Sequence, residues 1–128
     1  MKKRYRASLS LILAAAIALL TGCTNKISEK DNGKTVDLKG GSKFFVRLEG
    51  NPTTGYNWKI KSYDKNIIEQ VGEVDYVEES DKIGAGGHYT FNFKALSPGQ
   101  TKLELIYLRE WEKDTPPIEA FEVTLKVK

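Results

Sequence analysis

Apolar and polar residues alternate with a period of two along most of the chain after about residue 33. This pattern is typical of strands that turn one face to a core and the other to water, as in antiparallel sheets. Seven segments show it: residues 36–39, 43–49, 56–61, 74–79, 88–95, 103–109 and 121–128. Only residues 62–70 have a composition that could hold a helical turn. The pattern therefore predicts an all-β domain.

Turn-forming residues separate the predicted strands. Glycine and proline lie between successive segments, at Gly40-Gly41, Gly50-Asn51-Pro52, residues 84–87, Ser97-Pro98-Gly99 and Pro116-Pro117. About seven short strands in a domain of about 95 residues favour an immunoglobulin-like antiparallel β-sandwich. An open barrel is the alternative, because the pattern alone does not distinguish the two architectures.

The first 22 residues are typical of a targeting signal. A basic start, Met1 to Arg6, precedes an apolar run from Ala7 to Leu20, which is shorter than the roughly 20 residues that a membrane-spanning helix needs. The ending Leu-Thr-Gly-Cys resembles the bacterial lipobox, which implies cleavage before Cys23 and a lipid on its sulfur. The alternative is a plain signal peptide followed by an incidental cysteine. We expect an extracytoplasmic, membrane-anchored lipoprotein.

This interpretation divides the chain into three parts. Residues 1–22 form the signal peptide, residues 23–32 a flexible tether to the lipid, and residues 33–128 the folded domain. The tether is predicted because its residues are polar and show no periodicity.

Charge and cysteine content exclude several functions. Residues 1–22 carry four basic residues and no acidic residue. Residues 23–128 then have 16 basic against 17 acidic residues, so the folded domain lacks the excess of basic charge that nucleic-acid binding needs. Cys23 is the single cysteine, so the domain has no internal disulfide, thiol nucleophile or cysteine metal site. His88 is the single histidine and is expected to be a solvent-facing structural residue. We expect no enzyme, metal or cofactor; a glycosidase-like acid pair is the remaining enzymatic alternative.

Three connections stand out. The first, Asn51-Pro52-Thr53-Thr54-Gly55, combines a fixed φ at proline with a permissive glycine and presents two small polar residues. The second ends in a glycine cluster at residues 84–87, and the third places Trp111 among charged residues. Each could be an ordinary connection. In a sandwich they are alternate loops, however, and alternate loops tend to emerge at one end as a recognition edge.

The same three segments resemble the chagasin family of cysteine-protease inhibitors over roughly residues 33–128. The residues that carry the resemblance are Asn51, Pro52, Thr53, Thr54, Gly55, Tyr56, Gly84, Ala85, Gly86, Gly87, Arg109, Glu110 and Trp111. Glu110 departs from the family pattern, which usually has proline between the arginine and the tryptophan.

The resemblance implies a reversible, tight-binding, non-covalent inhibitor of papain-like cysteine proteases on an immunoglobulin-like fold. Thr53 and Thr54 would lie over the catalytic Cys–His pair. Residues 84–87 would run along one wall of the cleft, and Arg109 and Trp111 would pack on the other. We expect a monomer whose partners are such proteases and, through Cys23, a membrane. The rival interpretation is an immunoglobulin-like adhesion or assembly module that binds a partner other than a protease.

Overall fold

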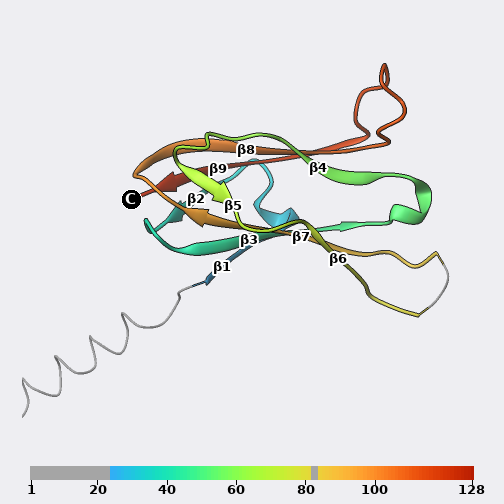
Figure 1. Ribbon diagram of the computed structural model, residues 1–128, viewed down its shortest axis with the longest axis horizontal. Coiled ribbons are helices and arrows are strands. Elements are labelled where there is room, and N and C mark those ends of the chain that lie inside the picture. The colour runs from blue at the N-terminus through green and yellow to red at the C-terminus, as the bar shows by residue number, and fades with distance from the viewer. Residues whose placement is uncertain (1–23, 82–83) are drawn as a thin grey trace, which may run out of the picture.

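The computed structural model describes residues 24–81 and 84–128, which form nine β-strands and two short 3-10 helices (Figure 1). Their order is β1 (Thr24–Ile27), η1 (Glu29–Asp31), β2 (Thr35–Leu38), β3 (Lys43–Gly50), η2 (Pro52–Thr54), β4 (Asn57–Ser62), β5 (Ile68–Gln70), β6 (Asp75–Glu78), β7 (Gly87–Ala95), β8 (Gly99–Leu108) and β9 (Glu119–Val127). The predicted signal peptide and Cys23 lie outside the described residues. Within those residues no helix has the length and apolar character needed to cross a bilayer.

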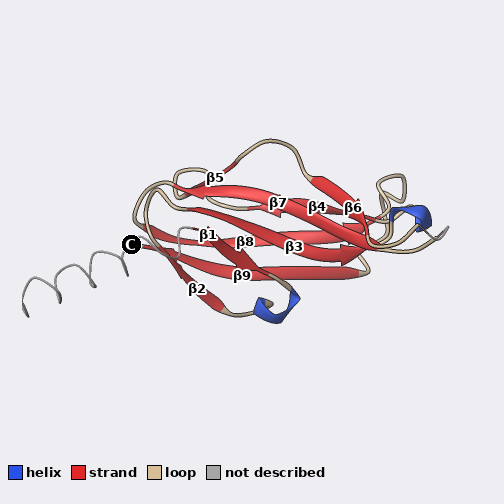
Figure 2. Ribbon diagram, turned by 90° about the horizontal axis from the view of Figure 1, so that it is seen from below, coloured by secondary structure: helices blue, strands red, loops and turns tan. Residues whose placement is uncertain are grey.

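The strands make two sheets packed face to face, which confirms the predicted β-sandwich (Figures 1 and 2). One sheet has the order β1-β3-β7-β5, with β6 also paired to β7; the other has the order β2-β9-β8-β4. Most pairings are antiparallel, as the alternating pattern predicts. The parallel pairs, β1 with β3 and β2 with β9, place the first two strands at sheet edges.

Alternate residues of the strands fill the space between the sheets. In β7 the buried positions include Tyr89, Phe91, Phe93 and Ala95, while the residues between them reach the surface. Phe93 stacks on Phe44 of β3 with ring centroids 5.3 Å apart. The rest of the buried apolar core is Ile27, Val46, Leu48, Leu38, Trp58, Ile68, Leu103, Leu105, Tyr107, Phe121, Val123, Leu125 and Val127. The two-residue period thus supplies one continuous core.

The prediction of a flexible tether is wrong for residues 24–31. Residues 24–27 form β1, whose backbone pairs with β3, and Ile27 is 1% exposed in the core. The backbone amide of Glu49 donates to Glu29 Oε1 at 2.5 Å, which holds η1 against β3. An edge strand needs few apolar residues because its ladder satisfies the backbone, so this polar segment gives no periodic signal. Residues 24–128 therefore contain both sheets and the core of the described residues, so we expect them to fold without the leader.

Residues 62–70 contain the helical turn that the sequence allows and a strand that it does not predict. A single hydrogen-bonded turn follows Asp64, whose carbonyl accepts the amides of Ile67 and Ile68 at 3.1 and 3.2 Å. The chain then continues as β5 rather than as a helix, because Ile68–Gln70 pairs with the end of β7. With β1 and β5 the described chain has nine strands, two more than predicted.

Candidate functional site

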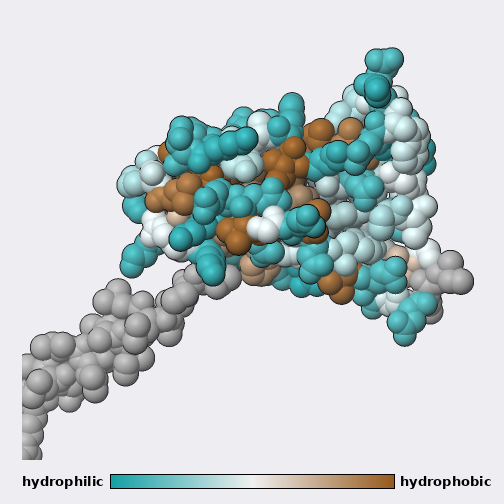
Figure 3. All heavy atoms as spheres, viewed as in Figure 1, coloured by the Kyte–Doolittle hydropathy of each residue, from teal (hydrophilic) through white to brown (hydrophobic). Residues whose placement is uncertain are grey.

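Three loops converge at one end of the sandwich, as the strand alternation predicts (Figure 1). Loop 1 spans residues 50–56 between β3 and β4, loop 2 residues 79–86 between β6 and β7, and loop 3 residues 109–118 between β8 and β9. In the space-filling view loop 3 projects as a hydrophilic prominence, and the surface below it consists of residues of intermediate hydropathy (Figure 3). We call this end the loop pole.

Loop 1 is ordered by its own side chains. Asn51 caps η2: its Oδ1 accepts from the Thr53 backbone amide at 3.1 Å and from the Thr53 hydroxyl at 2.6 Å. The Thr54 hydroxyl donates to the Asn51 carbonyl at 2.7 Å. Gly55 closes the turn with φ +88°, a left-handed conformation that other residues adopt with strain. The two threonines are exposed at the apex of a turn that is already folded.

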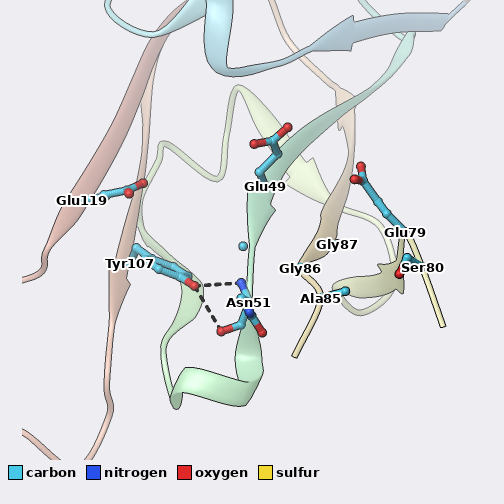
Figure 4. A pocket seen from close by; sticks show the side chains of 10 residues that line it. Glu49, Asn51, Glu79, Ser80, Ala85, Gly86, Gly87, Tyr107 and Glu119 are labelled. Carbon is cyan, nitrogen blue, oxygen red and sulfur yellow. Dashed lines mark hydrogen bonds between the residues drawn. The ribbon is translucent and has the colours of Figure 1, made fainter. Parts of the chain in front are cut away.

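The base of loop 1 is fixed to the opposite sheet by a buried tyrosine. The backbone amide of Asn51 donates to Tyr107 Oη at 2.9 Å (Figure 4). Tyr107 is 8% exposed, and its ring stacks on Tyr56 and lies 5.0 Å from Trp58, centroid to centroid. Sequence reasoning missed this role, because Tyr107 lies on the core face of β8 with Leu103 and Leu105 and so gives only a packing signal.

Loop 2 is connected to loop 1 by the same asparagine. Asn51 Nδ2 donates to the Gly84 carbonyl at 2.8 Å, and the Glu79 amide donates to the Gly86 carbonyl at 3.2 Å. A Cβ on Gly86 would lie 3.3 Å from the Gly50 carbonyl oxygen, so glycine allows the two loops to approach closely. A hollow of about 440 Å³ lies beside this contact, lined among others by Tyr107 and the carboxylates of Glu49, Glu79 and Glu119 (Figure 4).

Loop 3 is connected to the apex of loop 1 by Arg109. The guanidinium donates twice to the Thr54 carbonyl, from Nε at 3.1 Å and from Nη2 at 2.9 Å. It also lies over the Tyr56 ring at 4.4 Å and near the Trp111 ring at 5.8 Å. Arg109 therefore contacts both loops and fixes their relative position.

The two residues after Arg109 point in different directions. Trp111 is 67% exposed, yet the edge of its ring packs so closely on Gly55 that a Cβ there would clash with it. Glu110 forms an ion pair with Lys59 of β4 at 2.9 Å, between side chains that are about half exposed. Sequence reasoning did not find Lys59, because no motif connects β4 with loop 3.

The structure divides the predicted site residues into three groups. Thr53, Thr54, Gly84, Glu110 and Trp111 are exposed, and Asn51, Pro52, Gly55, Ala85, Gly86 and Arg109 are partly buried at the loop pole. Tyr56 and Gly87 lie further inside: Tyr56 packs under Arg109, and Gly87 is buried at the start of β7. These two residues support the loops from below.

His88 is less exposed than the sequence interpretation expects. Its side chain is 17% exposed and contacts Glu79 Oε1 at 2.6 Å and Arg47 Nη2 at 3.2 Å. These contacts hold the end of β6 beside β7, so His88 is a structural residue at the base of loop 2.

Two tyrosines beneath the loops have raised pKa values. Burial raises the pKa of Tyr89 to about 12, and the neighbouring Tyr107 adds to the effect. Its hydroxyl donates to Asn57 Oδ1 at 2.7 Å, next to loop 1. Burial also raises the pKa of Tyr76, and the carboxylate of Glu78 adds to it. Both groups stay neutral at physiological pH. Tyr89 acts in packing and hydrogen bonding, whereas the Tyr76 hydroxyl is buried without a hydrogen-bond partner among the described residues. In residues 24–81 and 84–128 no histidine, cysteine or acidic cluster is arranged to hold a metal ion.

Comparison with known proteins shows which family has this fold and these three loops. Residues 37–125 match the family described as chagasin family peptidase inhibitor I42. Amoebiasin-1 of Entamoeba histolytica is 32% identical over 88 residues, which cover 66% of this chain and 82% of that protein. Chagasin of Trypanosoma cruzi is 28% identical over 107 residues, which cover 80% of this chain and 97% of that protein.

A solved structure shows the same fold. The crystal structure of the cysteine protease inhibitor EhICP2 from Entamoeba histolytica superimposes with a TM-score of 0.74 at 24% identity, over 82% of this chain and 96% of that one. The family match covers most of the described domain and includes all three loops. The chain therefore belongs to the chagasin family of peptidase inhibitors.

Proposed function

We propose that this protein is a reversible, non-covalent inhibitor of papain-like cysteine proteases, and that it acts as a monomer by filling the active-site cleft with its three loops. The observation that carries the proposal is the set of hydrogen bonds that join the loops. Asn51 connects loops 1 and 2, and Arg109 connects loops 1 and 3. A recognition surface that is ordered before binding loses little conformational entropy on docking.

Occlusion needs no chemistry from the inhibitor. Thr53 and Thr54 would enter the cleft over the catalytic cysteine and histidine, with loops 2 and 3 on either side. Trp111, a large exposed aromatic held on Gly55, suits the role of an interface anchor. The apex of loop 1 is closed by hydrogen bonds within the loop, which leaves its backbone poorly suited to the extended form in which proteases bind substrates.

Steady-state inhibition of papain by residues 24–128 tests the proposal. We expect competitive, reversible inhibition, which Thr53→Arg with Thr54→Arg weakens at least about tenfold because the added side chains block entry of the loop. The matched control is Asn66→Arg with Ser97→Arg, at exposed turns of the opposite end. The proposal is wrong if no papain-like enzyme is inhibited at micromolar concentration, or if both double variants inhibit equally well.

We further propose that the protein is an extracytoplasmic lipoprotein anchored through a lipid on Cys23. The basic start, the short apolar run and the Leu-Thr-Gly-Cys ending support this. Two or more acyl chains anchor a protein stably where one does not. The test is Cys23→Ser in a bacterial host, which is expected to abolish acylation and move the protein from the membrane to the soluble fraction. Unchanged membrane association of that variant contradicts the proposal.

A further inference from the structure

The two ends of the sandwich carry opposite charge. The loop pole, taken as residues 49–59, 78–88 and 109–119, contains eight acidic residues against four lysines and arginines, a net charge of −4. We call the other end the anchor pole and define it as residues 37–43, 63–69, 94–99 and 126–128. It contains six lysines against three acidic side chains, a net charge of +3. The other residues of the domain carry six charges of each sign.

Hydrogen bonds between turns assemble the anchor pole. The Gly40 amide donates to the Lys128 carbonyl at 3.0 Å and the Gly41 amide to the Ala95 carbonyl at 2.9 Å. The Leu96 amide donates to the Ile67 carbonyl at 2.8 Å. Four segments distant in sequence thereby form one surface. Five of its lysines are exposed and the sixth is partly exposed: Lys39, Lys43, Lys65, Lys94, Lys126 and Lys128.

The chain enters the domain at this same pole. Thr24 is the first residue of β1 and pairs with Lys43, the first residue of β3. Cys23 directly precedes it, so no linker separates the predicted site of lipidation from the folded domain. From Lys43 the strand β3 runs for eight residues to loop 1 at the opposite end (Figure 1). At about 3.3 Å per residue the strand alone spans roughly 25 Å.

We propose that the anchor pole is a membrane-facing surface that lies on an anionic phospholipid bilayer and points the three loops away from it. The orientation rests on the lipid anchor and the inhibitory loops of the proposed function. The partner follows from the charges: anionic headgroups attract the lysines of the anchor pole and repel the carboxylates of the loop pole, so both ends favour the same orientation. The attraction acts within about a Debye length of the surface.

This orientation has a consequence for the target. A rigid domain without a linker cannot turn its loops toward the bilayer while its first strand begins at the lipid. The cleft of a bound protease would then lie beyond the far end of the sandwich. The geometry points to proteases that approach from the aqueous phase on the same side of the membrane, rather than to enzymes whose clefts lie close to that bilayer.

Energy transfer from tethered domains to labelled lipid measures the orientation. Residues 24–128 contain no cysteine, so Ser97→Cys at the anchor pole and Thr115→Cys in loop 3 each give one dye position. An N-terminal histidine tag binds each domain to vesicles that contain nickel-chelating lipid and a headgroup acceptor, which replaces the lipid anchor. On phosphatidylglycerol–phosphatidylcholine vesicles we expect about threefold or greater transfer from position 97 relative to position 115, and a smaller ratio in high salt.

Charge reversal supplies the matched controls. Lys39→Glu, Lys43→Glu and Lys65→Glu together should bring the ratio close to one, whereas Lys30→Glu, Lys61→Glu and Lys102→Glu outside both poles should preserve it. Equal energy transfer from positions 97 and 115 in the original domain overturns the proposal. An unchanged ratio of the two transfers after reversal of the three lysine charges of the anchor pole overturns it as well. Papain inhibition in solution by the two charge-reversal variants is expected to be unchanged. Absence of inhibition by the original domain would contradict the proposed function without affecting the orientation measured on vesicles.

Discussion

At the scale of single residues, Arg109 has a role within the domain in addition to the protease contact that the family resemblance implies. In the structure its Nε and Nη2 donate to the Thr54 carbonyl, and the guanidinium covers the Tyr56 ring. Glu112 lies 3.7 Å from Nη1 on the other side. Arg109 therefore fixes the apex of loop 1 relative to loop 3 and determines where Trp111 sits.

Arg109→Lys tests this positioning role. Lysine keeps the charge but lacks the planar fork that donates twice to one carbonyl and stacks on an aromatic ring. We expect inhibition to weaken about tenfold while the thermal midpoint changes little. The loops of this variant are less ordered before binding, so ordering them on the protease costs conformational entropy. The matched control is Lys113→Arg, an exposed cation of the same loop. Inhibition by Arg109→Lys equal to that by the original chain contradicts the role.

Tyr89 gives a prediction about alkaline pH. Its pKa in the folded domain is about 12 against an ordinary value of 10.0, so the folded state binds the phenolic proton more tightly than the unfolded state does. Its contribution to stability is therefore complete below pH 10 and is lost as the pH rises to about 12. Chemical unfolding of the original chain and of Tyr89→Phe should show a stability difference that narrows over this interval. A constant difference contradicts the raised pKa.

At the scale of elements, the edge strands decide how the domain is closed. β1 pairs with β3 in one sheet and β2 pairs with β9 in the other, and η1 joins them. The Asn32 side chain accepts the Glu122 amide at 3.0 Å, so this crossover is bonded to the second sheet as well. The N-terminal segment is therefore part of the sandwich and links its two layers.

Ile27→Ala tests whether β1 belongs to the fold. Ile27 is 1% exposed, and truncation of a buried isoleucine typically costs about 2–5 kcal/mol. We expect a loss in that range by denaturant unfolding, with papain inhibition retained at temperatures where the variant is folded. Lys26→Ala, at the exposed position next to it, should cost less than about 0.5 kcal/mol. Equal and small losses for both variants would restore the interpretation of this segment as a tether.

Elements with a repeating apolar face could be predicted from the sequence, and those without one could not. The seven predicted strands and the convergence of three loops follow from period-two patterning and strand direction. β1 contributes a single buried isoleucine and β5 is three residues long, so neither shows a period. The bonds from Asn51 to Gly84 and from Arg109 to Thr54 join side chains to backbone carbonyls, and such contacts leave no trace in the order of residue types.

At the scale of the whole molecule, a net charge close to zero conceals an uneven distribution of charge between the two ends of the sandwich. Residues 23–128 sum to −1, yet the loop pole carries −4 and the anchor pole +3. Several loop-pole carboxylates are already paired, Glu110 with Lys59 and Glu79 with His88. Among the described residues, Glu78, Asp114 and Glu119 have no cation within ion-pair distance. Their field extends from the loops toward an approaching protease.

This field should affect how fast a protease binds more than how long it stays. We expect Glu78→Gln, Asp114→Asn and Glu119→Gln together to change the association rate constant about threefold to tenfold at low salt, slower for a protease with a basic cleft rim and faster for an acidic one. The association rate constant of this variant, divided by that of the original chain, should approach one as salt shortens the Debye length below about 10 Å.

The matched control is Glu73→Gln, Asp75→Asn and Glu122→Gln, which removes the same number of charges outside both poles and should have a smaller effect. Stopped-flow measurement of both constants tests this, and a salt-independent change confined to dissociation would assign the three carboxylates to direct contact instead.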